Sequence, residues 1–350
     1  MQVSVVVCTY TMDRYDVFTE AVESALAQTH EPVEVVLVID GNPEVYEHAV
    51  DDFGDRANVV VHDNNENRGI SYSRTKGAEL STGEIVAFID DDFMLMLGDN
   101  VFGGNLGDVA NHQQEERADA AFLDDDGIAE PDWIAKHVET YAETNAVAVA
   151  GYVAPNWQSE KPDFFPEEFY WLVGCTELGF AEDGEEIRNG YGSNVSYRRD
   201  VFLDVGGYDV NTGRKGDRHI QAHEAPVGIR IREAYGKGVV YVEDAVVHHT
   251  LFEYRGEFRW LVFRSFWQGF SKRVMEVLYP GAQGNESEFL KDLFVRALPS
   301  RVRRAVGERS LDPVQEAIAI LVFTGAVGLG YLYGLIRRDV LREEVEESAA

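Results

Sequence analysis

The sequence has only two cysteines and seven lysines in 350 residues. Cys8 and Cys175 cannot form a disulfide framework, and without a CxxC pair or a Cys/His spacing they do not indicate a zinc site. Because Cys8 lies in an apolar run, we expect it to be a buried structural thiol. No charged leader with an apolar centre precedes the first apolar run, which begins at Val3. We therefore expect no signal peptide and a cytosolic catalytic part.

The few lysines accompany a large excess of acid. The 31 Lys and Arg residues oppose 62 Asp and Glu residues, which gives a formal net charge of −31. An acidic, lysine-poor surface is typical of proteins in near-saturated salt, where the Debye length is about 3 Å and self-repulsion is screened. The composition therefore predicts that the protein comes from a halophilic organism, an archaeon. It argues against non-specific binding to nucleic acid, whose phosphates would repel the chain.

The first 90 residues alternate apolar runs with segments of helical spacing, and the 45% of apolar residues in the chain suffices for a core. We expect strands at 3–8, 33–39, 59–62 and 85–89, and helices at 16–27 and 71–80. Runs that are apolar throughout indicate a parallel sheet covered on both faces. Ligands of such sheets bind beyond the carboxyl ends of the strands. Polar residues follow these ends: Thr9, Tyr10, Asp40 and the triplet 90–92.

The charge and hydropathy change after residue 250. Between Arg255 and Arg309, eleven basic residues oppose six acidic ones. From Ala317 to Ile336 the chain has twenty residues without a charge, a length that spans a hydrocarbon core of about 30 Å. We expect a transmembrane or membrane-embedded helix over 313–336, with a buried core helix as the alternative. Its GxxxG pattern, Gly330 and Gly334, indicates a helix-packing face.

The charges on the two sides of this apolar segment predict its orientation. A basic segment at 251–312 precedes it and an acidic tail at 337–350 follows it. By the positive-inside rule this arrangement keeps the large N-terminal domain in the cytoplasm. It also places arginines beside anionic membrane lipid.

One short motif occurs twice. AFIDDD at 87–92 recurs as AFLDDD at 121–126. Two carboxylates spaced i, i+2 at the end of a parallel strand can hold a hard divalent cation and leave positions open for a diphosphate. A solvated acidic turn is the alternative in so acidic a chain.

Further motifs extend this pattern and resemble the inverting glycosyltransferases of family 2, which have the GT-A fold, a Rossmann-like and mostly parallel sheet. They are VSVVVCTY at 3–10, VLVIDG at 36–41, NRGISYSRTKGAELSTGEIVAFIDDD at 67–92, GIAEPDWI at 127–134 and YGSNVSYRRDVFLDVGGYD at 191–209. The segments RKGDRHIQAHEAP at 214–226 and HHTLFEYRGEFRWLV at 248–262 resemble haloarchaeal membrane members that add a hexuronic acid to lipid-linked glycans for S-layer N-glycosylation.

The resemblance implies a GT-A domain over 1–250 and assigns donor-binding roles within it. Thr9 and Tyr10 would line the nucleotide pocket. Asp40 would accept a hydrogen bond from the uracil N–H or the ribose, with an Asx turn before Gly41 as the alternative. Arg68 and Arg74 would face the diphosphate or the sugar carboxylate, for which a guanidinium is well shaped.

The resemblance also implies the catalytic base. The family's acidic pair stands before a helix, and here His223 replaces its first member while Glu224 keeps the second. Glu224 would take the proton of the acceptor hydroxyl as this attacks the anomeric carbon and expels UDP with inversion. His248 and His249 match a family position where a His approaches the metal or the diphosphate. A His pair in a strand-end turn is the alternative.

Residues 93–126 are an unusual insertion, because family 2 proteins continue directly from the triplet to a segment like GIAEPDW. Residues 93–122 resemble a fragment of a sugar-1-phosphate nucleotidylyltransferase, whose LGDN aspartate, here Asp99, binds magnesium. The insertion leaves two candidate metal motifs. They are Asp90 and Asp92 in the first triplet, and Asp124 and Asp126 in the second. We favour the second slightly, because it keeps the segment that leads to the acceptor.

The resemblance implies a membrane-anchored enzyme that needs Mg²⁺ or Mn²⁺. It would move a hexuronic acid from a UDP-sugar to a dolichol-phosphate-linked saccharide at the cytoplasmic face of the cell membrane. Membrane lipid, and through helix–helix contacts other membrane glycosylation enzymes, would be its partners. Two alternatives stay open. They are an inactive membrane scaffold of glycan assembly and a sugar-1-phosphate nucleotidylyltransferase.

Overall fold

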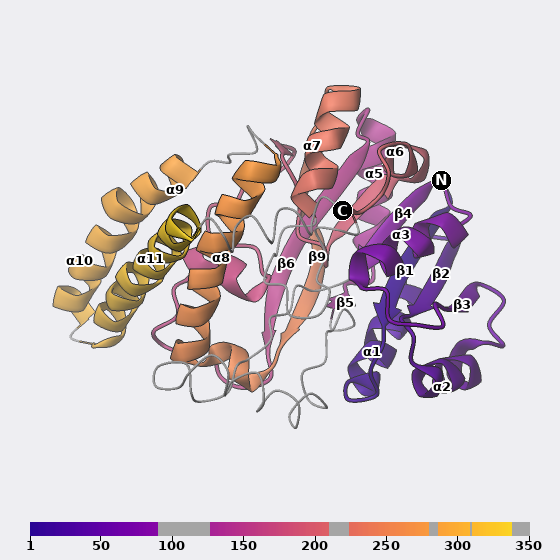
Figure 1. Ribbon diagram of the computed structural model, residues 1–350, viewed down its shortest axis with the longest axis horizontal. Helices are drawn as coiled ribbons and strands as arrows, with labels where there is room; N and C mark the ends of the chain where they lie inside the picture. The colour runs from indigo at the N-terminus through magenta and orange to yellow at the C-terminus, as the bar shows by residue number, and fades with distance from the viewer. Residues whose placement is uncertain (90–126, 210–223, 280–285, 309, 338–350) are drawn as a thin grey trace.

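The computed structural model describes residues 1–89, 127–209, 224–279, 286–308 and 310–337. A nine-stranded mixed sheet lies at the centre, with helices on both faces and a group of helices at one end (Figure 1). The strands follow the order β3-β2-β1-β4-β8-β6-β9-β5, and β7 (Glu186–Ile187) pairs with β9. This is the α/β class that the sequence predicts.

The first half of the sheet is parallel. Its strands are β1 (Val3–Thr9), β2 (Val33–Ile39), β3 (Val59–Asp63) and β4 (Ile85–Ile89), which differ from the expected ranges by at most one residue. Thr9 pairs with Ile39, and Val7 pairs with Ile89. Every residue of β1 is buried, as expected for a strand with helices on both sides. The carboxyl ends of β1, β2 and β4 therefore share one edge of the sheet.

The second half is mixed. Its strands are β5 (Gly127–Ala129), β6 (Ala148–Trp157), β8 (Val195–Arg198) and β9 (Val239–Leu251). Because β8 runs antiparallel to both β4 and β6, β6 points the same way as β4, and so does its parallel partner β9. β5 runs against β9, with Gly127 paired to His249 near the end of β9. β5 thus begins at the same edge where β4 ends.

Helices cover the two faces of the sheet in two sets. The helices α1 (Tyr15–Leu26), α2 (Pro43–Phe53) and α5 (Trp133–Glu143) pack on one face, and α3 (Ile70–Leu80), α6 (Arg199–Asp204) and α7 (Glu224–Tyr235) pack on the other. Each set contributes the apolar stripe of its helices to a separate core, and the sheet between the cores is shared.

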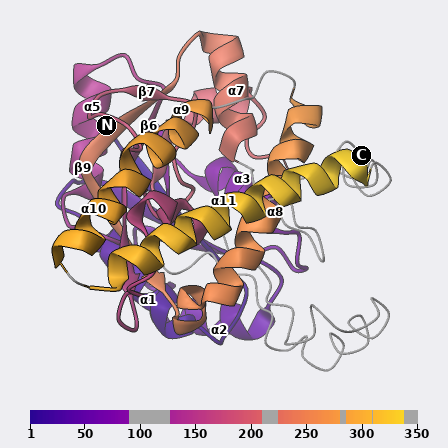
Figure 2. The same ribbon diagram turned by 90° about the vertical axis from the view of Figure 1, so that its left-hand side faces the viewer.

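The C-terminal helices form a layer at one end of the molecule (Figure 2). They are α8 (Phe258–Leu278), α9 (Glu286–Asp292), a π turn at Leu293–Ala297, α10 (Leu298–Glu308) and α11 (Asp312–Ile336). Together with the 3₁₀ turn η1 (Glu167–Val173) they enclose a third core, rich in aromatic rings. Among the described residues, α11 alone is long and apolar enough to cross a membrane.

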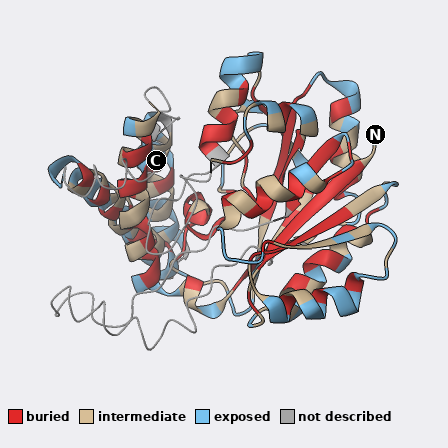
Figure 3. Cartoon of the chain, turned by 45° about the vertical axis from the view of Figure 1, so that its right-hand side comes forward, coloured by how far each residue is buried: buried red, intermediate tan, exposed pale blue. Residues whose placement is uncertain are grey.

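Burial follows this layering. The strands at the centre of the sheet are buried, whereas the outer faces of the flanking helices are exposed (Figure 3). Cys8 is buried in β1, as expected, and Cys175 is buried as well.

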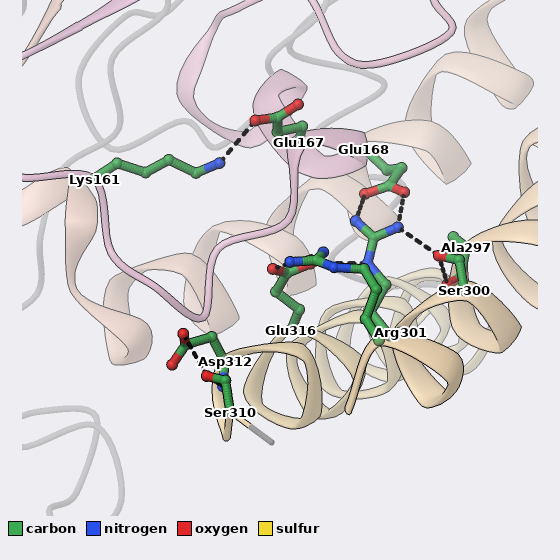
Figure 4. A network of polar contacts seen from close by, with 10 residues as sticks. Lys161, Glu167, Glu168, Ala297, Ser300, Arg301, Ser310, Asp312 and Glu316 are labelled. Atoms are coloured by element: carbon green, nitrogen blue, oxygen red, sulfur yellow. Dashed lines mark hydrogen bonds and ion pairs between the residues drawn. The ribbon is translucent and has the colours of Figure 1, made fainter. Parts of the chain in front are cut away.

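A buried ion-pair network holds the C-terminal helices to η1 (Figure 4). The Arg301 guanidinium of α10 donates to both oxygens of Glu168, each at 2.7 Å. Its Nε donates to Glu316 of α11 at 2.8 Å. The three side chains are only 11%, 10% and 15% exposed. One arginine therefore joins three elements and compensates two buried carboxylates.

Replacing this arginine should loosen the helical layer. In Arg301→Met, Glu168 and Glu316 would lose their main counter-ion, and breaking a buried pair from one side costs about 3–5 kcal/mol. Denaturant unfolding at high salt measures the loss. The matched control is Arg296→Met. The side chains of Arg296 and its partner Asp292 are exposed, so the loss of this pair should cost less than about 1 kcal/mol of stability. Equal losses in the two variants would contradict the role of the network.

A second buried polar cluster lies between α5 and the mixed second half of the sheet. His137 of α5 is fully buried, with Nδ1 at 2.6 Å from the Ser196 hydroxyl and Nε2 at 3.2 Å from Asn194 Oδ1. The Trp133 indole donates to the same oxygen at 2.8 Å, and the Asn194 amide donates to two backbone carbonyls of β6 and the β9 bulge. Burial lowers the pKa of His137 to about 4.

This pKa predicts a pH dependence of stability. Between pH 6.5 and 4 the unfolded chain binds a proton at this histidine that the folded chain resists, so the folded state loses stability as the pH falls. The loss reaches about 3 kcal/mol at the lower end. Denaturant unfolding at each pH should show a shallower decline for His137→Gln than for the wild type. Parallel curves would contradict the prediction.

Candidate functional site

The candidate site lies along the shared carboxyl edge of β1, β2, β4 and β9. Of the positions that the sequence singled out, Thr9 ends β1, Asp40 follows β2, and His248 lies three residues before Leu251, the last residue of β9. Parallel register places the ends of β1 and β2 side by side, and β9, which runs in the same direction, ends at the same edge of the sheet. The edge is where a sheet of this kind binds its ligand.

Asp40 is buried and organises the loop before α3. Its Oδ1 accepts from the Asn64 amide at 2.7 Å and from the Arg68 backbone N–H at 2.9 Å. Its Oδ2 accepts from the Gly69 N–H at 2.8 Å. A carboxylate offers about four acceptor positions, so these bonds leave capacity for one ligand donor. The Asx turn considered from the sequence does not describe these contacts, because Asp40 reaches across the edge rather than to its own turn.

Thr9 and Tyr10 take part through their backbone. The Thr9 carbonyl accepts from the Asp40 N–H at 2.8 Å, and the Tyr10 carbonyl accepts from the Asn42 amide at 2.7 Å. The Asn42 Oδ1 in turn caps α2. These bonds hold the carboxyl ends of β1 and β2 side by side at this edge of the sheet.

The two predicted arginines lie differently. Arg68 is half-exposed, with its guanidinium 4.1 Å from the Tyr72 ring centroid. Arg74 is buried, 5.1 Å from the centroid of Tyr208. Both tyrosines line one hollow of about 440 Å³ between α3 and α7. The hollow is also lined by Thr75, Lys76, Glu79, Gly206, Asp209 and Arg230. Neither arginine lines the hollow itself, but each packs on a tyrosine that does.

The His pair divides between two environments because neighbouring residues of a strand face opposite sides. His248 is half-exposed, and its Nε2 lies 2.6 Å from Glu130 Oε1. His249 is buried and its Nε2 contacts the buried Arg255. Neither lies in a turn, since both belong to β9. His248 is therefore the member that can reach a ligand, whereas His249 belongs to the packing of Arg255.

Glu130 is a candidate site residue that the sequence analysis did not single out. It follows β5 and meets His248 only because β5 pairs with β9. A carboxylate on one ring nitrogen orients an imidazole and makes its other nitrogen a better ligand. Its place in the GIAEPDWI motif was the signal that could have drawn attention to it.

The remaining predicted residues are placed only in part. Glu224 is the first residue of α7, but its side chain lies outside the described part of the structure. Asp90, Asp92, Asp124 and Asp126, together with the insertion 93–126, lie outside the described residues as well. Their flanks are described: Ile89 ends β4 and Gly127 begins β5, both at the candidate edge. Within the described ranges, no group of three His, Cys, Asp or Glu residues could hold a metal.

Comparison with known proteins connects this edge to one family. The family model described as glycosyl transferase family 2 matches residues 4–98 and 120–206, on either side of the central part of the insertion. A protein of Haloferax volcanii named glucosyl-dolichyl phosphate glucuronosyltransferase is 56% identical over 344 residues, which cover 98% of this chain and 99% of that protein.

Two further relatives bear on the insertion and the fold. The UTP–glucose-1-phosphate uridylyltransferase AglF of Haloferax volcanii is 46% identical over 80 residues, which cover 21% of this chain and 31% of that protein. This confirms the partial resemblance to a nucleotidylyltransferase. The mannosyltransferase PcManGT of Pyrobaculum calidifontis, solved with GDP-Man and Mn²⁺, superposes with a TM-score of 0.51 at 16% identity, over 95% of this chain and 87% of that one.

The matched segments contain the strand ends, the Asp40 loop and the strand β5 that positions Glu130. The similar architecture of PcManGT confirms the predicted GT-A fold. The family match and the nearly full-length relative agree on the reaction class. The chain belongs to glycosyl transferase family 2 and is a glycosyltransferase.

Proposed function

We propose that the enzyme transfers a hexuronic acid from a UDP-sugar to a dolichol-phosphate-linked saccharide, with inversion at the anomeric carbon. The observation that carries the proposal is the 56% identity, over nearly the whole of both chains, with the glucosyl-dolichyl phosphate glucuronosyltransferase. The product would serve protein N-glycosylation of a halophilic archaeon. The enzyme would act at the cell membrane with its catalytic domain in the cytoplasm.

The nucleotide would bind at the ends of β1 and β2. The bonds from Asp40 to the Arg68 and Gly69 amides hold the loop that leads into α3. The acceptor position that Asp40 keeps is suited to a uracil N–H. Thr9 and Tyr10 would form the wall of this pocket, and Arg68 and Arg74 would border the donor from the α3 side.

The chemistry needs one proton acceptor and one stabilised leaving group. Glu224 would remove the proton of the acceptor hydroxyl as its oxygen forms the bond to the anomeric carbon. The bond from that carbon to the UDP oxygen breaks, and UDP leaves with the electron pair. The N-terminal position of Glu224 in α7 places its backbone at a helix start, where a carboxylate is favoured.

A divalent cation, Mg²⁺ or Mn²⁺, fits the donors at this edge. The half-exposed imidazole of His248, held by Glu130, is a suitable ligand for Mn²⁺. Asp124 and Asp126 would complete its set, because the next residue, Gly127, is paired with the neighbour of His248. Asp90 and Asp92, which follow β4, are the other candidates. When bound, the cation neutralises charge that develops on the leaving diphosphate.

The insertion need not disturb this arrangement. β4 and β5 contact each other, and both strands pair within the sheet although the insertion separates them in sequence. The connection between them leaves and returns at one edge. We therefore propose that the catalytic frame is complete when a single Asp triplet connects β4 directly to Gly127, without the residues between the two triplets.

Transfer of radiolabel from UDP-glucuronate to a lipid extract that contains dolichol-phosphate glucose tests the proposal. We expect transfer with Mn²⁺ or Mg²⁺, and its loss on chelation. A variant that lacks 93–126 and keeps one Asp triplet should retain activity. In the full chain, Asp124→Ala with Asp126→Ala should reduce transfer by about 100-fold or more, whereas Asp90→Ala with Asp92→Ala should reduce it less.

Two further measurements separate the alternatives. Metal-dependent UDP binding without transfer from any UDP-uronate or UDP-hexose to the lipid acceptor would support an inactive scaffold instead. Release of pyrophosphate from UTP and a sugar phosphate would support a nucleotidylyltransferase. Glu224→Gln should retain UDP binding and lose transfer. Full transfer by this variant would remove Glu224 from the mechanism.

Asp40 allows a separate test of the nucleotide site. In Asp40→Asn the side-chain amide cannot accept from both the Arg68 and Gly69 amides, so we expect a loss of stability of about 1–3 kcal/mol and at least tenfold weaker UDP binding. Calorimetric titration with UDP measures the binding. The matched control is Asp51→Asn, on the exposed face of α2, which should change neither quantity. Unchanged UDP binding in Asp40→Asn would contradict the assigned pocket.

A further inference from the structure

The outer face of α11 is a continuous apolar stripe. Its exposed side chains recur in steps of three and four residues, so they lie on one side of the helix. They are Val314, Ile318, Leu321, Leu329, Leu332 and Ile336, and they are 41% to 77% exposed. Gly325 continues the stripe, and a Cβ placed there would meet no atom within 4 Å. The stripe extends over the whole length of the helix.

The opposite face of α11 is buried against α8. A Cβ at Gly330 would lie 1.8 Å from the Phe266 carbonyl oxygen, and one at Gly269 of α8 would lie 1.9 Å from the Val327 carbonyl oxygen. Only glycine allows the two backbones to come so close. Gly334 packs on α8 as well. The GxxxG face is thus used inside the molecule, and the exposed stripe is what remains for a partner.

The two helices run in the same direction. The ring of Phe258, at the start of α8, lies 5.6 Å from the ring of Phe323 in the middle of α11, and further along Gly334 lies against Arg273. Charged residues of α8 therefore accompany the C-terminal half of α11. They are Arg259, Arg264, Lys272, Arg273 and Glu276.

This packing opposes a membrane-spanning position. If α11 crossed a bilayer and kept its contacts, the charged residues of α8 would enter the hydrocarbon, which is costly. The Tyr331 hydroxyl also donates to Glu276 at 2.6 Å, and Glu316 is held by Arg301. A helix that lies in the plane of the membrane surface keeps all these contacts and still buries its apolar stripe in lipid.

The charge of the neighbouring helix α10 indicates which kind of membrane surface the stripe would contact. α10 lies beside α11 on the same end of the molecule (Figure 2). It exposes Val302 and Val306 together with Arg303 and Arg304. The segment 255–309 that contains it is net positive, whereas the rest of the chain is strongly acidic. An anionic bilayer would attract this end and repel the rest.

We propose that α10 and α11 form a monotopic docking surface for an anionic lipid bilayer, with α11 lying in the membrane plane and its stripe of six side chains inserted. The inference does not depend on the transferase reaction. Its test uses the full-length protein without substrate, so a failure would leave the proposed function untouched.

Flotation with vesicles of equal parts phosphatidylglycerol and phosphatidylcholine tests the docking. We expect the wild type to float with the vesicles at low salt and to remain bound at high salt, because apolar insertion is not screened. Leu321→Gln with Leu329→Gln should lower the partition coefficient at least about tenfold. The control, Val50→Gln, changes a 38% exposed side chain of α2 at the other end of the sheet and should float like the wild type.

The orientation of α11 needs its own measurement. Cys8 and Cys175 are buried, so a fluorophore can be attached to a single new cysteine at Val314, Gly325 or Ile336. For a helix in the membrane plane, a membrane-impermeant reductant outside the vesicles should quench all three probes. For a spanning helix, the probe at 325 would be deep and the probe at 336 protected.

Two outcomes would overturn the proposal. One is protection of the probe at 336, which would establish a spanning helix. The other is absence of wild-type flotation, above all if light scattering shows a dimer that Leu321→Gln with Leu329→Gln dissociates. That result would assign the stripe to a second copy of the chain.

Discussion

The parallel register of β1, β2 and β4 is the constraint on which the rest of the site depends. It brings Thr9, Ile39 and Ile89 to one edge, and the hydrogen bonds between residues 9–10 and 40–42 prevent that edge from spreading. Asp40 then holds the loop into α3 with three hydrogen bonds. β9 returns to the same edge and brings His248 to Glu130. The candidate site therefore draws on segments that are more than 200 residues apart.

In the first 89 residues the four strands and the helices α1 and α3 could be predicted to within one residue, because fully covered parallel strands read as continuous apolar runs and these two helices keep a regular spacing. The helix α2 (Pro43–Phe53) was not predicted. The strands from β5 onward could not be predicted, since antiparallel pairing across more than 100 residues leaves no local pattern. For the same reason, sequence reasoning found His248 but not its partner Glu130, and could not separate it from the buried His249. It predicted a ligand role for Asp40, which stays a prediction, and did not predict the three hydrogen bonds by which Asp40 holds the loop before α3.

The apolar segment at the C-terminus shows a different limit. Hydropathy averages over all sides of a helix, so it reported the length of α11 but not that one side packs on α8 through Gly330 and Gly269. The ion pairs of Arg301 explain how so apolar a helix stays fixed to an acidic protein. The exposed Arg303 and Arg304 of α10 add positive charge at the end of the molecule where the exposed stripe lies. That the apolar stripe and the positive charge lie at the same end of the molecule becomes visible only when the positions of these residues in space are known.

The return of the chain to one edge between β4 and β5 has a thermodynamic consequence. The entropy cost of closing a loop grows with the logarithm of its length, by about 0.6 kcal/mol for each doubling. A link ten times longer than three residues would therefore cost the sheet only about 2 kcal/mol. Because such a cost is small beside the buried cores on both faces, this position of the fold can accept foreign sequence and lose it again. The connection after β4 is thus a place where new segments could be acquired and tested without loss of the folded enzyme.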